Sequence, residues 1–129
     1  MSERKPIIPQ GLTASPAFAP GMQVDELLFT SGQVSQANDG SIVGIGDCAA
    51  QARQIMARIQ TIVEAAGATM LDVVKITTFL TNLDDYPAYN QVRSETFPSN
   101  PPASSTVIVA GLVRPELLIE IEAVVHIPS

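Results

Sequence analysis

The stretch that most constrains the fold is residues 47–67, DCAAQARQIMARIQTIVEAAG. Its apolar residues recur at intervals of three and four, which places them along one side of a helix. They are Ala52, Ile55, Met56, Ile59, Val63 and Ala66. Asp47 stands where a side chain can cap the first turn, and Gly67 stands where glycine commonly ends a helix. The pattern predicts a helix that must bury one face against another element.

The rest of the chain supplies strands for that face. Segments rich in β-branched and apolar residues predict strands over 27–33, 72–81, 105–111 and 116–127. A proline-rich arm over 6–20 leads through 21–29 into the first central strand, and Asp39-Gly40 in the loop 35–44 predicts a turn.

A second helix is predicted over 84–98. Asp84 or Asp85 is expected to cap it, Pro87 lies in its first turn, and Pro98 closes it. Two helices and about six strands predict one α+β domain over residues 1–129, with both helices on one face of a mixed sheet.

The residue pattern of segment 116–127 indicates what the second face of the sheet contacts. Leu117, Ile119, Ile121, Ala123, Val125 and Ile127 are predicted to face one way, and Leu118, Glu120, Glu122, Val124 and His126 the other. A face that mixes apolar residues with charge usually meets another subunit, so we expect a homo-oligomer.

Charge and composition narrow the classes of partner. Thirteen acidic residues against seven scattered Lys and Arg give a net charge of −6, and the chain has no Trp. A nucleic-acid partner is therefore disfavoured, because the chain has no cluster of Lys and Arg to neutralise phosphates and no Trp on which bases could stack. No apolar run reaches the ~18–20 residues of a membrane span, and no secretory signal is evident. A single cysteine, Cys48, fits a reducing compartment, and we expect a cytoplasmic protein.

Several side chains have two open interpretations. The dipole at a helix start could activate Cys48, or the thiol could be inert. His126, the single histidine, is expected to be structural rather than a metal ligand. Glu120 and Glu122 share a strand face, where they either lie at the solvent edge, pair with Lys75 or Arg93, or provide a general acid/base of raised pKa in a cleft.

Four segments together resemble the RidA/YjgF family over nearly the whole chain. They are ELLFTSGQ (26–33), QARQIMARIQTIVEAAGATMLDVVKITTFLTNLDDYPAYNQV (51–92), PPASSTVIVAGL (101–112) and IEIEAVV (119–125). The resemblance implies a chorismate-mutase-like fold and a homotrimer with a central barrel and small-molecule clefts between subunits. It also implies hydrolysis of imines and enamines to ammonia and a keto acid, with no metal and no cofactor.

The family pocket carries over only where residues agree. Ser31, Gly32 and Asn90 match residues that line the cleft, and Glu120 matches the glutamate thought to position water, which makes it the candidate catalytic residue. Thr106 fits a position where cysteine or threonine is common. Two residues depart from the family pattern: Ser104 replaces an arginine, and Phe18 stands where a tyrosine is usual.

The change at Ser104 bears on the substrate. Arginine would hold a carboxylate through a forked, charged contact, whereas serine offers one hydroxyl. A charged hydrogen bond contributes roughly 1.5–3 kcal/mol, so carboxylate binding should weaken at least about tenfold. The sequence places neither Arg93 nor Arg114 in the cleft as a replacement, and a Ser104→Arg exchange is expected to raise the rate.

Three functions follow as hypotheses. The first is an imine or enamine hydrolase that does not carry out standard 2-aminoacrylate deamination. The second is a ligand-binding or regulatory trimer without catalysis. The third is an endoribonuclease, which the acidic balance disfavours.

Overall fold

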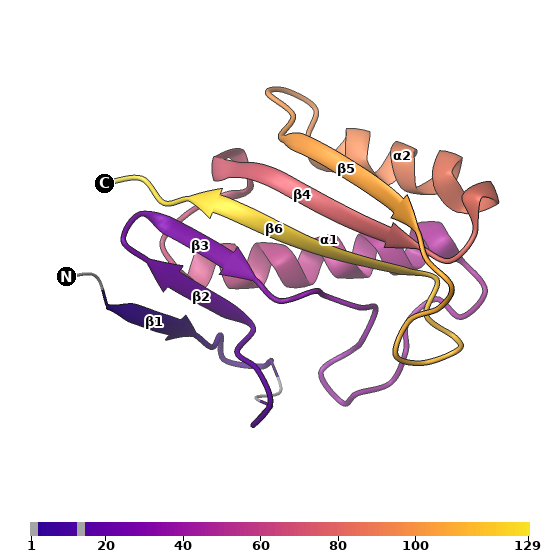
Figure 1. Cartoon of the computed structure of the whole chain (residues 1–129), viewed down its shortest axis with the longest axis horizontal. Helices are drawn as coiled ribbons and strands as arrows, with labels where there is room; N and C mark the ends of the chain where they lie inside the picture. The colour runs from indigo at the N-terminus through magenta and orange to yellow at the C-terminus, as the bar shows by residue number, and fades with distance from the viewer. Residues whose placement is uncertain (1–2, 13–14) are drawn as a thin grey trace.

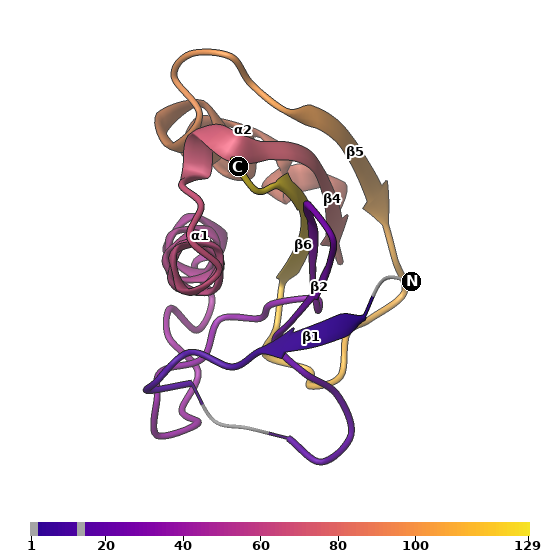
Figure 2. The same cartoon turned by 90° about the vertical axis from the view of Figure 1, so that its left-hand side faces the viewer.

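The computed structural model describes residues 3–12 and 15–129, and within them the chain forms six strands and two α-helices. The strands are β1 (Arg4–Ile7), β2 (Gly21–Val24), β3 (Leu27–Thr30), β4 (Val73–Leu80), β5 (Ala103–Ile108) and β6 (Ile119–His126). They form one sheet in the order β1-β2-β3-β6-β4-β5, in which β4 and β5 are parallel and the other neighbours antiparallel. Helices α1 (Cys48–Ala65) and α2 (Tyr86–Thr96) lie on the same side of the sheet (Figures 1 and 2). The predicted α+β fold, with its mixed sheet, is confirmed.

Helix α1 follows its local signals closely. The Asp47 carboxylate accepts a hydrogen bond from the Ala50 amide at 3.0 Å, and Gly67 follows the helix with φ of +84°. The predicted apolar face is buried, except that Ala66 lies just beyond the helix and is only half-buried. Both end signals and the helical face are therefore confirmed.

Helix α2 begins differently from the prediction. The Asp85 side chain makes no capping bond. Asn82 instead accepts from the Asp84 amide at 2.9 Å and starts a 3-10 turn, η2 (Leu83–Asp85), that leads into the helix. The aspartate cap was wrong because the asparagine one turn earlier takes over this role. Pro87 does lie in the first turn, and Pro98 follows the end of the helix.

The N-terminal part holds more strand than predicted. β1 lies in the first residues of the chain and pairs with β2, and a turn at Asp25, with φ of 53°, joins β2 to β3. Pro6 is tolerated in β1 because this strand is at the edge of the sheet. The predicted turn is present, since Gly40 has φ of +87° and its amide donates to the Ala37 carbonyl.

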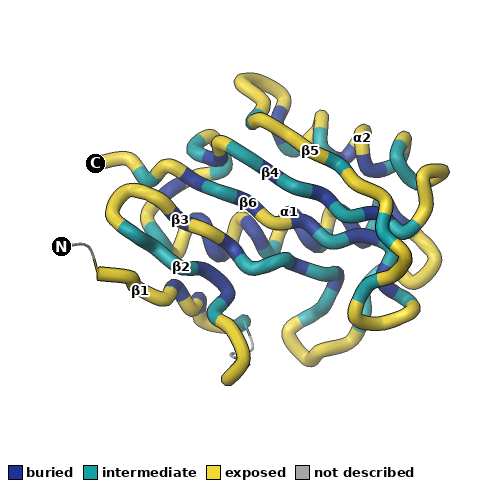
Figure 3. The backbone as a smooth tube through the Cα atoms, in the orientation of Figure 1, coloured by how far each residue is buried: buried dark blue, intermediate teal, exposed yellow. Residues whose placement is uncertain are grey.

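Strand β6 separates the two faces of the sheet as predicted. Leu117, Ile119, Ile121, Ala123 and Val125 are buried beneath the helices, while Ile127 is half-buried. On the other face Glu120 and Val124 are half-buried and Glu122 is exposed. The tube of β6 in Figure 3 accordingly changes between buried and less buried positions along its length. The face with Glu120 also carries Phe29 and Val107, each more than two-fifths exposed. The expectation that another subunit covers it stays a prediction.

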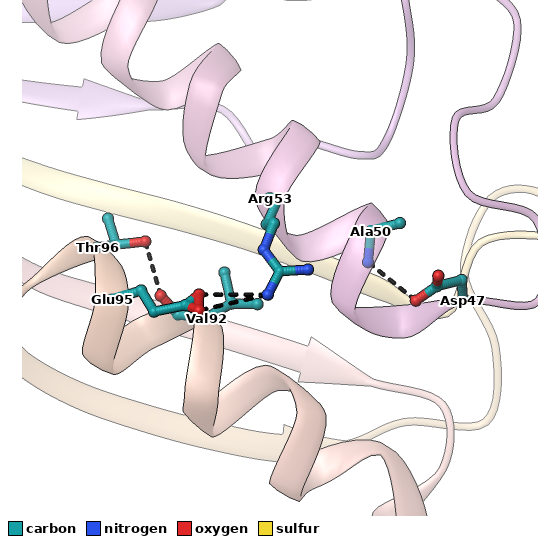
Figure 4. A network of polar contacts seen from close by, with 6 residues as sticks. All are labelled: Asp47, Ala50, Arg53, Val92, Glu95 and Thr96. Carbon is teal, nitrogen blue, oxygen red and sulfur yellow. Dashed lines mark hydrogen bonds and ion pairs between the residues drawn. The ribbon is translucent and has the colours of Figure 1, made fainter.

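Packing holds the two helices together more than charge does. Arg53 of α1 pairs with Glu95 of α2 at 3.3 Å, but both side chains are about half exposed (Figure 4). Such surface pairs contribute little, roughly 0–1 kcal/mol. Buried Ile55, Ile59 and Val92 form part of the same hydrophobic core. Within the described residues, neither helix is long and apolar enough to cross a membrane.

Candidate functional site

The predicted site residues fall into two groups on this chain. Phe18, Ser31, Gly32 and Glu120 form a first half-site near the end of β3. Asn90 of α2 and Ser104 and Thr106 of β5 form a second half-site, which also contains Arg93. Phe18 and Gly32 line one hollow and Asn90 and Ser104 line another, and the two hollows share no residue. One chain therefore does not bring the two half-sites together.

Backbone contacts shape the first half-site. The Ser31 hydroxyl donates to the Ala19 carbonyl at 2.5 Å, and the Ser31 amide donates to the Pro20 carbonyl at 2.8 Å. These bonds tie the segment that carries Phe18 to the end of β3. Phe18 and Gly32 line the same cavity, with the phenylalanine 59% exposed.

Gly32 leaves room for the Glu120 carboxyl group. A Cβ atom at position 32 would lie 2.1 Å from Glu120 Oε2, and real Cβ contacts are essentially never under 3.0 Å. The absent side chain is thus what lets the carboxyl lie against the backbone at the end of β3.

The surroundings of Glu120 raise its pKa. Burial contributes most, because it disfavours the charged form, and the nearby Glu122 carboxylate adds to the effect. Of the alternatives open for Glu120, pairing with Lys75 or Arg93 is not found in the described residues. Lys75 Nζ donates to Ser105 at 2.7 Å, and Arg93 donates to other partners. Glu120 is therefore a half-buried carboxyl group whose raised pKa suits proton transfer.

Arg93 is the functional candidate that the sequence did not place. Its guanidinium donates to Ser104 Oγ at 2.9 Å, Tyr86 Oη at 2.8 Å and Asn90 Oδ1 at 2.7 Å. It also lies over the rings of Tyr86 and Tyr89, at 5.6 and 5.0 Å from their centroids. Burial opposes its charge, but the hydrogen bond to Tyr86 and the interactions with both tyrosines outweigh this, and the pKa of Arg93 is raised.

The position of Arg93 shows that an arginine lies near Ser104, which the sequence alone left open. The serine is a strand residue whose hydroxyl accepts from an arginine on a neighbouring helix, so a cation lies beside position 104. The spacing of Arg93 from Tyr86, Tyr89 and Asn90, by seven, four and three residues, indicates one helix face. No local sequence pattern predicts that Arg93 also contacts β5.

The second half-site is rich in hydrogen-bond donors. Tyr86, Asn90 and Ser104 each accept from Arg93, which leaves both hydroxyl protons and the asparagine amide group free to donate elsewhere. The hollow beside them measures about 450 Å³, and Phe97, Pro98, Pro101 and Pro102 form its apolar wall. Thr106 is half-buried two residues after Ser104, on the same face of β5. Such a surface suits an anionic group next to a small apolar one.

Two other candidates have structural surroundings. Cys48 is buried, and desolvation, followed by the charges of Asp85 and Asp47, raises the pKa of its thiol to about 12. This environment favours the inert interpretation. His126 Nε2, at the end of β6, lies 2.9 Å from Oε2 of Glu26, which is in the turn before β3. In residues 3–12 and 15–129, no three side chains of His, Cys, Asp or Glu are grouped so as to hold a metal ion.

Comparison with known proteins gives a consistent result. The family model described as endoribonuclease L-PSP matches residues 9–127. The chain is similar to the crystal structure of the yeast protein YEO7, with 29% identity over 98% of this chain and 100% of that one and a TM-score of 0.91. A protein of unknown function of the conserved Rid family, YyfA from Yersinia pestis, has 28% identity over 97% and 100%, with a TM-score of 0.91. RidA from an Antarctic Psychrobacter has 28% identity over 95% and 100%, with a TM-score of 0.87.

Proposed function

Because the chain belongs to the endoribonuclease L-PSP family, which includes the RidA/YjgF proteins, we propose that it hydrolyses small imines or enamines. The observation that carries the proposal is the Glu120 carboxyl group, which is half-buried, lies against Gly32 and has a raised pKa. A carboxyl group of this kind exchanges protons near neutral pH more readily than an exposed one.

The reaction needs water and one proton-transferring group. Glu120 takes a proton from water as the water oxygen bonds to the imine carbon, and the proton passes to the nitrogen. The carbinolamine hydroxyl then gives its proton to the carboxylate, which passes it to the amino nitrogen as the carbon–nitrogen bond breaks, so the carboxylate is regenerated. The products are a carbonyl compound and ammonia. No metal or cofactor enters these steps.

Arg93 supplies the substrate anchor in this proposal. Its guanidinium lies at Ser104, with Asn90 and Tyr86 as neighbours, and carries a charge that none of these neutral partners neutralises. An imine that bears a carboxylate would bind there through charge-assisted hydrogen bonds. The loss of arginine at position 104 therefore does not by itself remove carboxylate substrates from consideration.

A cleft between subunits would join the two half-sites. Phe18, Ser31, Gly32 and Glu120 of one subunit would face Asn90, Arg93, Ser104 and Thr106 of the next. The exposed apolar residues on the uncovered sheet face, such as Phe29, support an assembly of this kind. We propose a homotrimer, to be tested by light scattering coupled to size-exclusion chromatography. A monomer at micromolar concentration would remove the shared cleft.

The role of Arg93 as the substrate anchor is tested by removing the arginine at position 93 and introducing one at position 104. The assay follows the decay of freshly generated 2-iminopropionate above its rate in buffer. Arg93→Ala should raise KM at least about tenfold through the lost charged contacts. The sequence predicted a gain from Ser104→Arg, but because Arg93 lies against Ser104, this exchange alone should not help, since it brings a second guanidinium against Arg93. The double variant Arg93→Ala/Ser104→Arg should recover activity. A faster Ser104→Arg enzyme, or a silent Arg93→Ala change, would contradict this role of Arg93.

The same assay separates hydrolysis from the alternative functions. Glu120→Gln should abolish turnover and leave ligand binding in place. A protein that binds small carboxylates but never exceeds the buffer rate would instead be a ligand-binding or regulatory member of the family. RNA cleavage that persists in nuclease-free preparations and disappears in Glu120→Gln would favour the endoribonuclease activity in the family's name, against the net charge of −6.

A further inference from the structure

A second arginine, Arg58, lies in the middle of α1 with two neutral partners. Its Nε donates to Gln33 Oε1 at 3.1 Å, and its NH1 donates to the Gln36 carbonyl at 3.1 Å. Gln33 is itself held firmly, because it is only 4% exposed, its side chain donates to the Ser31 carbonyl, and its backbone pairs with Ile121. The guanidinium is thus fixed against a rigid part of the molecule.

Its charge lacks a carboxylate partner. Arg58 takes no part in the ion pairs found among residues 3–12 and 15–129, such as Arg53 with Glu95 and Arg114 with Glu116. None of the four remaining residues of the chain is acidic. Arg58 is half-buried, and burial lowers its pKa. An arginine removed from water normally has a counter-charge, because desolvation is costly.

Arg53 provides the contrast on the same helix. It is 54% exposed and has the Glu95 carboxylate at 3.3 Å. The more exposed of the two arginines has a counter-ion, whereas the more buried one has none. A charged residue that served only to keep the protein soluble would be exposed like Arg53, so solubility does not explain the half-buried charge of Arg58.

Arg58 lines a cavity of about 290 Å³. Phe18, Pro20, Val34 and Ala37 contribute apolar surface to it, and Gln33 and Gln36 lie beside the guanidinium. This volume lies just below the usual range for ligand sites, about 300–1,000 Å³, so the cavity suits a small ligand. It is the cavity of the first half-site, since Phe18 and Gly32 line it as well, and it shares no residue with the Arg93 hollow.

We propose that this cavity binds a small monoanion, a carboxylate on a short apolar chain, with the carboxylate on Arg58. Two of the five guanidinium N–H groups are used by Gln33 and Gln36, so three remain for a ligand. The planar fork of arginine matches a carboxylate, and the apolar wall takes the chain. The proposal does not depend on hydrolysis, since binding alone would satisfy the charge.

The test uses hexanoate as the probe and hexanamide as its uncharged counterpart, with the full-length protein. Isothermal titration should give at least about tenfold tighter binding for hexanoate, since a charged contact is lost in the amide. Arg58→Gln should weaken hexanoate at least about tenfold, while Arg53→Gln, on the same helix, should leave it unchanged. Equal affinities for the two probes, or an Arg58→Gln protein that binds hexanoate normally, would overturn the proposal.

Amide chemical shifts of the wild-type protein locate the probe without any substitution. Hexanoate should shift the signals of Gln33, Val34 and Ala37, and these shifts should persist in Arg93→Gln. Shifts confined to Asn90 and Ser104 would assign the binding to the Arg93 hollow and refute the Arg58 site. This measurement keeps the proposal testable if Arg58→Gln does not fold.

Discussion

Gly32→Ala is the change that most directly tests the role of Glu120. The new Cβ would lie 2.1 Å from Glu120 Oε2, so the oxygen must retreat about 0.9 Å to reach the 3.0 Å limit (3.0 − 2.1). Misplacing a reacting group by about 1 Å can cost on the order of 10²-fold in rate, or about 2.7 kcal/mol. We therefore expect the rate constant for 2-iminopropionate decay to fall about a hundredfold.

The fold should tolerate this change. The clashing atoms belong to the end of a flexible side chain, and Gly32 does not have a positive φ. Gly111→Ala is the matched control, because nothing lies within 4 Å of a Cβ built at Gly111. Both variants should melt close to the wild type, and only Gly32→Ala should lose activity. A Gly32→Ala protein with turnover within about twofold of the wild type would refute the reasoning that Glu120 acts from this position.

Three further predictions concern stability and reactivity. In the folded protein, burial and Glu122 raise the pKa of Glu120 above its ordinary value of 4.5. The protonated carboxyl group therefore stabilises the fold in full below pH 4.5, and this contribution is lost as the pH rises through the raised pKa. Urea titration should therefore find Glu120→Gln more stable than the wild type at pH 7 but not below pH 4.5; equal stability at pH 7 would contradict the buried carboxyl. Tyr89→Phe should cost about 1–3 kcal/mol in the same assay, because it leaves the buried Thr78 hydroxyl, now 2.6 Å from Tyr89 Oη, without its partner. Adding Thr78→Val should recover part of that loss, and a purely additive double variant would argue against the bond. Cys48, with its thiol pKa near 12, should resist a disulfide reagent at pH 8 until the chain is unfolded, and fast labelling of the native protein would contradict its burial.

The sequence by itself determined the elements whose signals are local. The α1 periodicity, the Asp47 cap and the alternation along 117–125 depend on backbone geometry and on which side chains avoid water, and both can be inferred from neighbouring residues. The same reasoning was wrong for the α2 cap, where Asn82 and Asp85 are both suitable and the 3-10 turn selects the asparagine. It also missed β1, because four mostly exposed residues carry no apolar pattern.

Only the tertiary structure decided where the charges lie. Arg93 and Ser104 meet because β5 runs parallel to β4 and brings its edge beside α2. Glu120 reaches Gly32 because residues just beyond β3 pair with β6 across nearly ninety positions of sequence. A contact between distant segments depends on how whole elements pack, and a long charged side chain can turn toward several neighbours. Sequence patterns therefore predicted the fold and the family resemblance supplied the candidate residues, which stay predictions, while the two arginines that face the hollows became evident only in three dimensions.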